Sequence, residues 1–182
     1  VDSALLHHKT YFKSPIYGLL SDKAISYKNK ENAGFPRFET YTKQFMLKNL
    51  YKEIDYQGGL AFEGATVIGR GGNNLPAKLI VYKNETLRIT IKTPEFIFTK
   101  AGLTSPETLM ALYLEKDSIF HSNLSFSYNA DQHQINFFRS NNPISKSPCF
   151  NSFHMLDMYF EYLSWNLNEP RIILSRSRGS SI

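Results

Sequence analysis

Three side chains in the middle of the chain have the types that acyl transfer uses, namely Asp117, Ser118 and His121. If the chain turns there, the imidazole of His121 can approach the carboxylate of Asp117, with a hydroxyl beside them. A nucleophilic serine also needs a strained turn and oxyanion donors, and its usual sequence sign is Gly-x-Ser-x-Gly. No such pentapeptide occurs in the chain. The residues therefore do not predict a hydrolase, and we name no catalytic residue.

A second group, His154, Asp157 and Glu161, carries the side chains of a metal site. On a helix these three residues would share one stripe, but their spacing matches no established ligand motif. On a strand, His154 and Asp157 would point to opposite faces of the sheet. A solvated polar face is the favoured interpretation. We predict neither a bound metal nor a cofactor.

Two glycines and the cysteine form the remaining candidate patterns for a site. Gly64 and Gly69 have the spacing of a phosphate-binding loop, which requires Lys and then Ser or Thr directly afterwards. Arg70-Gly71 follows instead, and this favours a glycine-lined β-bulge and loop. Cys149 is the single cysteine, so it forms no internal disulfide, and the default for such a thiol is a buried, unreactive position.

The formal net charge is +5, and the basic residues are spread along the chain. Aromatic and basic residues are neighbours at Tyr27-Lys28, Tyr82-Lys83 and Phe138-Arg139. In proteins that bind single-stranded nucleic acid, such pairs supply stacking and phosphate contacts. Neighbours on a strand face opposite sides, so a ring in the core with its charge in solvent is the simpler interpretation. Binding of single-stranded nucleic acid by a basic β-domain is therefore the second hypothesis.

The elements that must position these groups are short apolar runs separated by Gly, Pro and Asn. Residues 79–82 and 87–92 are predicted to pair as a hairpin across Lys83-Asn84-Glu85. Residues 124–139 form a second predicted hairpin, with its turn at 129–132 and strict alternation before it. Further strands are predicted at 23–27, 42–50, 60–68, 96–99 and 172–174.

Four places leave the local structure open. Residues 42–50 fit a strand, but Gln44, Met46 and Lys48 are good helix formers, so a helix is the alternative there. Gly58-Gly59 indicates a turn or a bulge. Residues 105–115 fit a buried strand or a helix, with Ser105 as the N-cap and Pro106 in the first turn. Residues 153–167 fit either an amphipathic helix or a strand.

This pattern amounts to roughly eight to ten strands of ordinary length. Strands in that number must stack or close to cover their edges. We predict a mostly β fold, either an antiparallel sandwich or an open curved sheet or irregular β-solenoid, with at most one or two short helices. Residues 1–17 are expected to be an irregular lead-in, 18–174 a single β-rich domain, and 175–182 a flexible basic tail.

The sequence offers two kinds of candidate carbohydrate site, namely serines that could carry a sugar and aromatic rings that could bind one. Asp2-Ser3-Ala4 and Asp117-Ser118-Ile119 have the Asp-Ser/Thr-aliphatic pattern of O-glycosylation in Bacteroidota envelope proteins, which makes Ser3 and Ser118 candidate modification sites. Exposed aromatic rings can stack on sugar faces. Tyr11, Tyr17 and Trp165 are the rings that we expect to be exposed for such binding.

Five longer segments carry a resemblance to known proteins: FPRFE from 35, DYQGGL from 55, PAK from 76, LEKDSIFH from 114, and DMYFE from 157 onward to Trp165 and Glu169-Pro170. Together they resemble a group of very large, β-rich Bacteroidota cell-envelope proteins. The resemblance implies that this chain is an internal piece of a longer envelope protein. It also favours strand in the two open segments, and it carries over no functional residue.

The leading functional hypothesis is a non-enzymatic β module of a larger envelope or secreted protein, acting as a scaffold or in contact with protein or glycan. The non-Met start at Val1 fits a processed or excised chain. Its expected partners are other domains of the same long chain, envelope proteins or glycan, at a cell-envelope or extracellular location. No apolar run is long enough to predict a transmembrane segment. An enzyme that uses Asp117, His121, Asp157 or Glu161 is the third hypothesis.

Overall fold

The computed structural model describes residues 3–7, 15–24, 33–72, 74–115, 117–140 and 143–176. Over these residues the chain is mostly β, with one 3₁₀ turn, η2 (Pro143–Lys146). The strands in chain order are β1 (Ala4–Leu6), β2 (Ile16–Ser21), β3 (Arg37–Thr40), β4 (Phe45–Tyr51), β5 (Ile54–Glu63), β6 (Thr66–Arg70), β7 (Ala77–Lys83), β8 (Thr86–Thr93), β9 (Glu95–Thr99), β10 (Gly102–Tyr113), β11 (Ser118–Asn129), β12 (Gln134–Phe138), β13 (Cys149–Asn151), β14 (Leu156–Met158), β15 (Tyr162–Asn166) and β16 (Ile172–Ser175).

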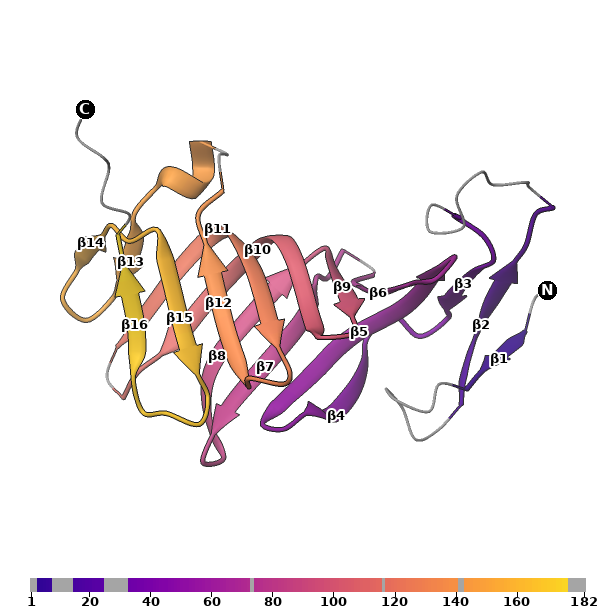
Figure 1. Ribbon diagram of the computed structural model, residues 1–182, viewed down its shortest axis with the longest axis horizontal. Helices are drawn as coiled ribbons and strands as arrows, with labels where there is room; N and C mark the ends of the chain where they lie inside the picture. Colours follow the sequence, from indigo (N-terminus) through magenta and orange to yellow (C-terminus); the bar gives the residue numbers. More distant parts are fainter. Residues whose placement is uncertain are drawn as a thin grey trace.

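All of these strands belong to one hydrogen-bonded antiparallel sheet. Its main path runs β1-β2-β3-β5-β6-β9-β10-β11-β12-β15-β16, and β4, β7, β8, β13 and β14 pair off this path. Figure 1 shows that β1–β3 lie at one end of the long axis, and β13–β16 lie at the other. The predicted mostly β, antiparallel fold is confirmed.

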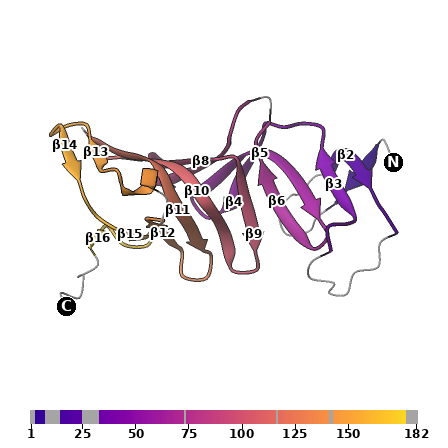
Figure 2. The same ribbon diagram turned by 90° about the horizontal axis from the view of Figure 1, so that it is seen from above.

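The sheet turns over on itself at three long strands, β5, β10 and β11. The first half of β5 pairs with β7 and its second half with β6. β10 also changes partners along its length, because its first half pairs with β9 and its second half with β8. In β11, Ile119 and Phe120 pair with β13, whereas 125–129 pair with β12. The result is two layers joined by bent strands, visible from above in Figure 2.

The bend in β10 has a local cause. The register against β11 shifts between Ser105 and Thr108 and again between Thr108 and Met110, and Pro106 supplies no N–H to the ladder there. The buried Thr93 hydroxyl on β8 lies 2.9 Å from the Ser105 hydroxyl and donates to the Glu107 carbonyl at 2.8 Å. The helical alternative for 105–115 is therefore wrong, because Pro106 marks a bulge in a strand and not a helix start.

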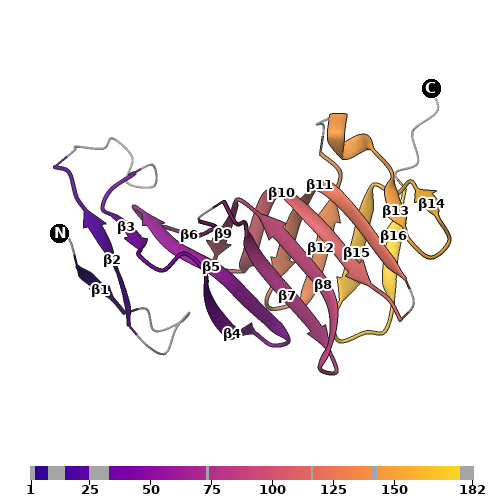
Figure 3. The same ribbon diagram turned by 180° about the vertical axis from the view of Figure 1, so that it is seen from behind.

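Aromatic rings fill the space between the layers. Tyr56 on β5 packs edge-on against Phe96 and Phe98 of β9, with ring centroids 6.3 and 6.0 Å apart. Phe96 continues to Phe126 at 5.9 Å, and Phe126 to Phe137 at 5.4 Å. Figure 3 shows from behind that β7 and β8 lie in front, and β12 and β15 in the layer behind them. These rings belong to a single buried core with the aliphatic side chains of both layers, and burial of that core stabilises the fold.

Both predicted hairpins are confirmed. Asn84 and Glu85 have φ of 50° and 62° and join β7 to β8, which is the conformation of a two-residue turn of type I′. The second hairpin pairs β11 with β12 over Ser125↔Phe138 to Asn129↔Gln134.

The prediction of a single strand over 60–68 is wrong. Gly64 takes φ of +60° and turns the chain between β5 and β6, because a glycine enters the left-handed region without steric penalty. Gly58 and Gly59, expected as a turn or bulge, lie inside β5. They lie at the point where the pairing of β5 changes partners.

Other boundaries also differ from the sequence prediction. The lead-in is not irregular throughout, because Ala4–Leu6 forms β1 and pairs with β2. Residues 22–24 are not strand, and 25–27 lie outside the described residues. The segment 153–167 forms a turn followed by β14 and β15, which excludes a helix there. The expected tail begins too early at 175, since Ser175 pairs with Tyr162, and 177–182 lie outside the description.

The strand number was underestimated. The described ranges contain sixteen strands. Three-residue strands such as β13 and β14 are too short to show alternation, so the sequence pattern does not reveal them. Only tertiary pairing makes them part of the sheet.

Candidate functional site

One end of the molecule is a single-layered extension of the sheet built from β1, β2 and β3. Figure 1 shows this extension projecting beyond the two-layered body. Leu5 on β1 pairs with Tyr17 on β2, and the Tyr41 N–H after β3 donates to the Tyr17 carbonyl at 3.2 Å. The three side chains therefore form a row across the strands on one face, with neighbours about 5 Å apart.

The row is exposed to solvent. Tyr17 is 64% exposed, Leu5 56% and Tyr41 52%, and the partly exposed Leu19 follows Tyr17 on the same face. We call these four residues the Tyr17 platform. Contiguous exposed apolar patches are a feature of binding surfaces.

The opposite face of the extension explains why the platform points outward. The Phe38 ring lies directly against Gly18, at a position where any side chain on Gly18 would collide with it. Phe38 is buried and packs edge-on against Phe62, with centroids 6.2 Å apart. Because Gly18 lets this ring close the inner face, the neighbouring Tyr17 and Leu19 must project to solvent.

Polar side chains frame the platform. Glu39 pairs in register with Leu19 and forms a 2.5 Å ion pair with Lys43. Tyrosine offers an apolar ring with a hydroxyl at its tip, and flanking carboxylate and ammonium groups accept and donate hydrogen bonds. This combination suits a ligand that presents both C–H faces and hydroxyls, such as a sugar chain.

The three rings predicted to be exposed have different outcomes. Tyr17 is exposed, and Tyr11 lies outside the described residues. Trp165 is only 5% exposed, and its indole N–H donates to the Glu169 carbonyl at 3.0 Å. The prediction for Trp165 is wrong because β15 places it on the inner face, between Ile135 and Ile172 in register.

Of the two candidate modification sites, Ser3 is exposed and precedes β1, and Ser118 is half-buried. The Ser118 hydroxyl lies 2.9 Å from that of Ser152. Attachment of a sugar at Ser118 would have to displace this contact, whereas Ser3 is accessible.

Asp117 is used as a structural anchor. Its carboxylate accepts hydrogen bonds from the Phe153 N–H at 2.8 Å and the Asn151 amide at 2.5 Å, as well as from the Ser118 N–H and the Ser152 hydroxyl. Desolvation acts to raise the pKa of Asp117, but these hydrogen bonds outweigh it and place the pKa below its ordinary value. The carboxylate fixes the turn after β13.

His121 is held elsewhere, by other partners. The Asn123 N–H donates to Nδ1 at 3.0 Å, so the ring proton belongs on Nε2, which lies 2.9 Å from the Ser147 carbonyl. Burial, together with the nearby charge of Arg139, lowers the pKa of His121, although the Ser147 contact acts in the opposite direction. Asp117 and His121 thus have separate hydrogen-bond partners.

The other grouped side chains do not converge. His154 lies in a turn, Asp157 on β14 and Glu161 in a bend. Within the described ranges, no three His, Cys, Asp or Glu side chains are grouped closely enough to hold a metal ion. Cys149 is buried, and desolvation raises its pKa to about 11 despite the opposing charge of Arg139.

The sequence prediction did not identify Leu5, Leu19 and Tyr41. The alternation Tyr17-Gly18-Leu19 was a usable signal, because a small residue between large apolar ones indicates two unequal faces. The sequence prediction placed the first strand at 23–27, and so it did not use the alternation over residues 17–19. Tyr41 joins the row only through the pairing of β2 with β3.

Comparison with known proteins finds no matching family model, no matching curated protein and no matching solved structure. In the part of the chain that the structure describes, no helix has the length and apolar character needed to span a membrane.

Proposed function

We propose that this chain is a non-enzymatic β module of a larger Bacteroidota envelope or secreted protein, and that it binds glycan through the Tyr17 platform. The platform is the observation that carries the proposal. It offers two exposed tyrosine rings in adjacent positions, Tyr17 on β2 and Tyr41 directly after β3. The paired backbone holds both rings in place, so little conformational entropy is lost when a sugar chain stacks on them.

A binding role agrees with how the titratable groups are used. Asp117 and His121 each satisfy hydrogen bonds that fix loops, which leaves them as structural groups rather than as an acid and a base in one cleft. The sheet also has edge strands at both ends, since β1 pairs only with β2 and β16 only with β15 among the described strands. Such edges suit a module with neighbours in a longer chain.

Nucleic-acid binding receives less support from the geometry. Lys83, one of the basic residues beside a ring, donates to the Leu167 carbonyl. Arg139 donates to three backbone carbonyls. Two of the predicted aromatic–basic pairs therefore have their cation engaged inside the protein and not presented to phosphate.

The experiment is affinity electrophoresis and calorimetry with cell-surface polysaccharides, using the wild type and the single variants Tyr17→Ala and Tyr41→Ala. We expect each variant to weaken binding by about tenfold, the loss typical of an aromatic anchor. Phe153→Ala, which removes an exposed aromatic ring at the other end of the molecule, is the matched control and should bind as the wild type does.

Two outcomes would reject the proposal. Undiminished binding by both platform variants removes the role of the Tyr17 platform. Binding of single-stranded oligonucleotide that falls steeply with added salt, without any response to polysaccharide, favours the nucleic-acid hypothesis instead.

A further inference from the structure

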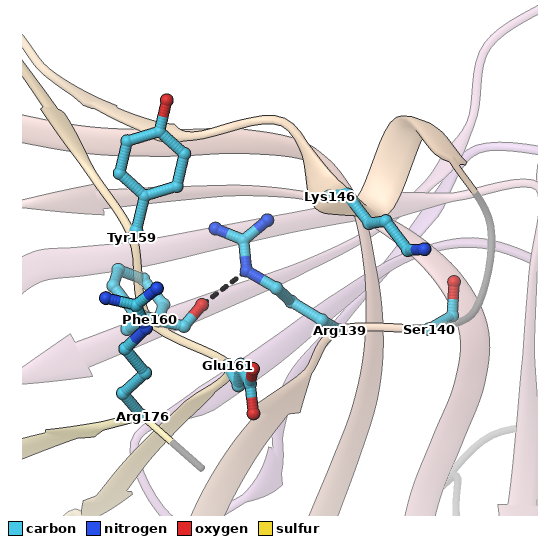
Figure 4. Close-up of a pocket in the computed structure, with 7 residues that line it drawn as sticks. All are labelled: Arg139, Ser140, Lys146, Tyr159, Phe160, Glu161 and Arg176. Carbon is cyan, nitrogen blue, oxygen red and sulfur yellow. Dashed lines mark hydrogen bonds between the residues drawn. The ribbon is translucent and has the colours of Figure 1, made fainter. Parts of the chain in front are cut away.

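A pocket of about 380 Å³ opens at the end of the molecule opposite the Tyr17 platform. Four separate parts of the chain form it, namely the residues after β12, η2, the segment before β15 and the residue after β16. Its main lining residues are Arg139, Lys146, Tyr159, Phe160, Glu161 and Arg176, and Figure 4 shows them.

Arg139 holds the walls of this pocket in place. Its Nε donates to the Phe160 carbonyl, and its Nη1 donates to the carbonyls of Ser145 and Ser147. The guanidinium also lies over the Phe160 ring, with its central carbon 5.9 Å from the centroid. A planar, rigid donor group thereby ties η2 to the segment before β15, so the pocket is formed before any ligand arrives.

The pocket is electropositive. Arg139, Lys146 and Arg176 line it, against the single carboxylate of Glu161. In the described parts of the chain, neither Lys146 nor Arg176 takes part in an ion pair. Three cations that line one concave surface beside a single carboxylate leave its potential positive and favour an anion.

The pocket also has a ring and more room than a simple ion fills. Tyr159 is 61% exposed and stands at the rim. A volume of about 380 Å³ falls within the range of small-molecule sites. The ligand therefore combines a negative group with a body that can stack on a tyrosine.

We propose that this pocket binds one acidic sugar residue, a hexuronate or sulfated hexose, with its anionic group between Lys146 and Arg176 and its ring against Tyr159. The site uses no residue of the Tyr17 platform and lies at the other end of the long axis. The pocket proposal is therefore independent of the proposed function, and each can fail without the other.

The test is a titration of the full chain, followed by NMR, with glucuronate and with glucose 6-sulfate. Glucose and acetate serve as probes for the sugar body alone and for the carboxylate alone. We expect both acidic sugars to bind, glucose to give no response, and acetate to bind at least about tenfold more weakly. Whichever acidic sugar binds tighter identifies the carboxylate or the sulfate as the natural group, and a hexuronate oligosaccharide that binds more tightly than glucuronate indicates a unit within a chain.

Variants locate the binding. Lys146→Ala and Arg176→Ala remove exposed side chains and should each weaken glucuronate binding by about tenfold, as charge-assisted contacts do. Tyr159→Ala should weaken glucuronate more than acetate, because acetate has no ring to stack. Arg139 is left intact because its hydrogen bonds hold the loops. Lys92→Ala, an exposed lysine on β8, is the matched control and should have no effect.

The proposal is overturned if neither acidic sugar binds, if glucose binds as well as glucuronate, or if the Lys146 and Arg176 variants bind unchanged. Equal binding of a short polyglutamate peptide would show a general anion surface and would also overturn it. Tyr17→Ala must leave the glucuronate titration unaltered, which separates a failure here from a failure of the Tyr17 platform.

Discussion

The Tyr56 hydroxyl occupies the space that a side chain on Gly58 would need. The same hydroxyl donates a 2.5 Å hydrogen bond to the Gly59 carbonyl and lies 2.8 Å from where a Cβ on Gly69 would stand. The buried ring therefore depends on two glycines in adjacent strands. This relationship explains glycines within β5 and β6, where glycine ordinarily weakens a strand.

Gly58→Ala should lower the free energy of unfolding by about 1–3 kcal/mol, the usual cost of inserting a methyl group into a packed core. Urea denaturation measures the change. Adding Tyr56→Phe removes the nearest colliding atom and leaves the ring carbon Cζ at 2.8 Å, so the double variant should lose less than the sum of the two single changes.

Gly59→Ala is the matched control for that experiment. Its nearest neighbours would be Thr40 Oγ1 at 3.1 Å and the Lys43 Cα at 3.3 Å, a tighter contact than usual but no collision. It should cost less than Gly58→Ala, and equal costs would contradict the packing explanation.

Stability should fall as the pH drops through the region below 6.5, because of His121. Its pKa is below the ordinary value of 6.5 in the folded protein, so between the two values the unfolded chain binds more protons than the native one. Acidification through that interval therefore favours unfolding. Urea titrations at a series of pH values check this.

His121→Gln should flatten the pH dependence in that interval, at some loss of stability at neutral pH. His154→Gln, at an exposed turn position, is the control and should leave the slope unchanged. If both variants keep the wild-type slope, the effect belongs to other groups.

Glu85→Gly should raise the free energy of unfolding by about 0.5–1 kcal/mol. Glu85 has φ of 62°, where a side chain is disfavoured and glycine is not. Thermal and urea denaturation give the difference. Lys92→Gly, at an exposed position near the end of β8, should instead destabilise, because Lys92 has no positive φ that glycine could relieve. A similar gain at both positions would contradict the turn argument.

Cys149 should react slowly with thiol reagents in the folded protein. Its pKa of about 11 and its burial leave little accessible thiolate at pH 8. Mass spectrometry after timed alkylation should show full labelling in denaturant and a much lower rate under native conditions. Equally rapid labelling in both states would show that β13 opens readily.

Local chemistry made parts of this fold predictable. The turn at Asn84 and the alternation before Asn129 identify hairpins because both depend on residues adjacent in sequence. At Pro106 the sequence left helix and strand open, and at Gly64 it predicted a continuous strand where the chain turns. A proline fits either a helix start or a strand bulge, and a glycine either a strand interior or a turn, until the partner strand is known.

The candidate sites were less predictable still. Tyr17 could be named from its type, but its row with Leu5 and Tyr41 depends on the pairing of three strands. The pocket brings Arg139, Lys146 and Arg176 together from positions up to 37 apart in the chain, and no periodicity signals that approach. Trp165 illustrates the converse, because a large ring is a candidate for either the core or the surface until the sheet assigns it a face.

The sequence by itself determined the mostly β class, the antiparallel hairpins and the favoured use of charged side chains at the surface. These follow from periodicity, turn residues and side-chain polarity, which act over a few neighbouring residues. The tertiary structure alone decided where β5, β10 and β11 bend, which rings are buried and which cations share a pocket. Those properties depend on contacts between distant segments, and their energies appear only once the two layers pack together.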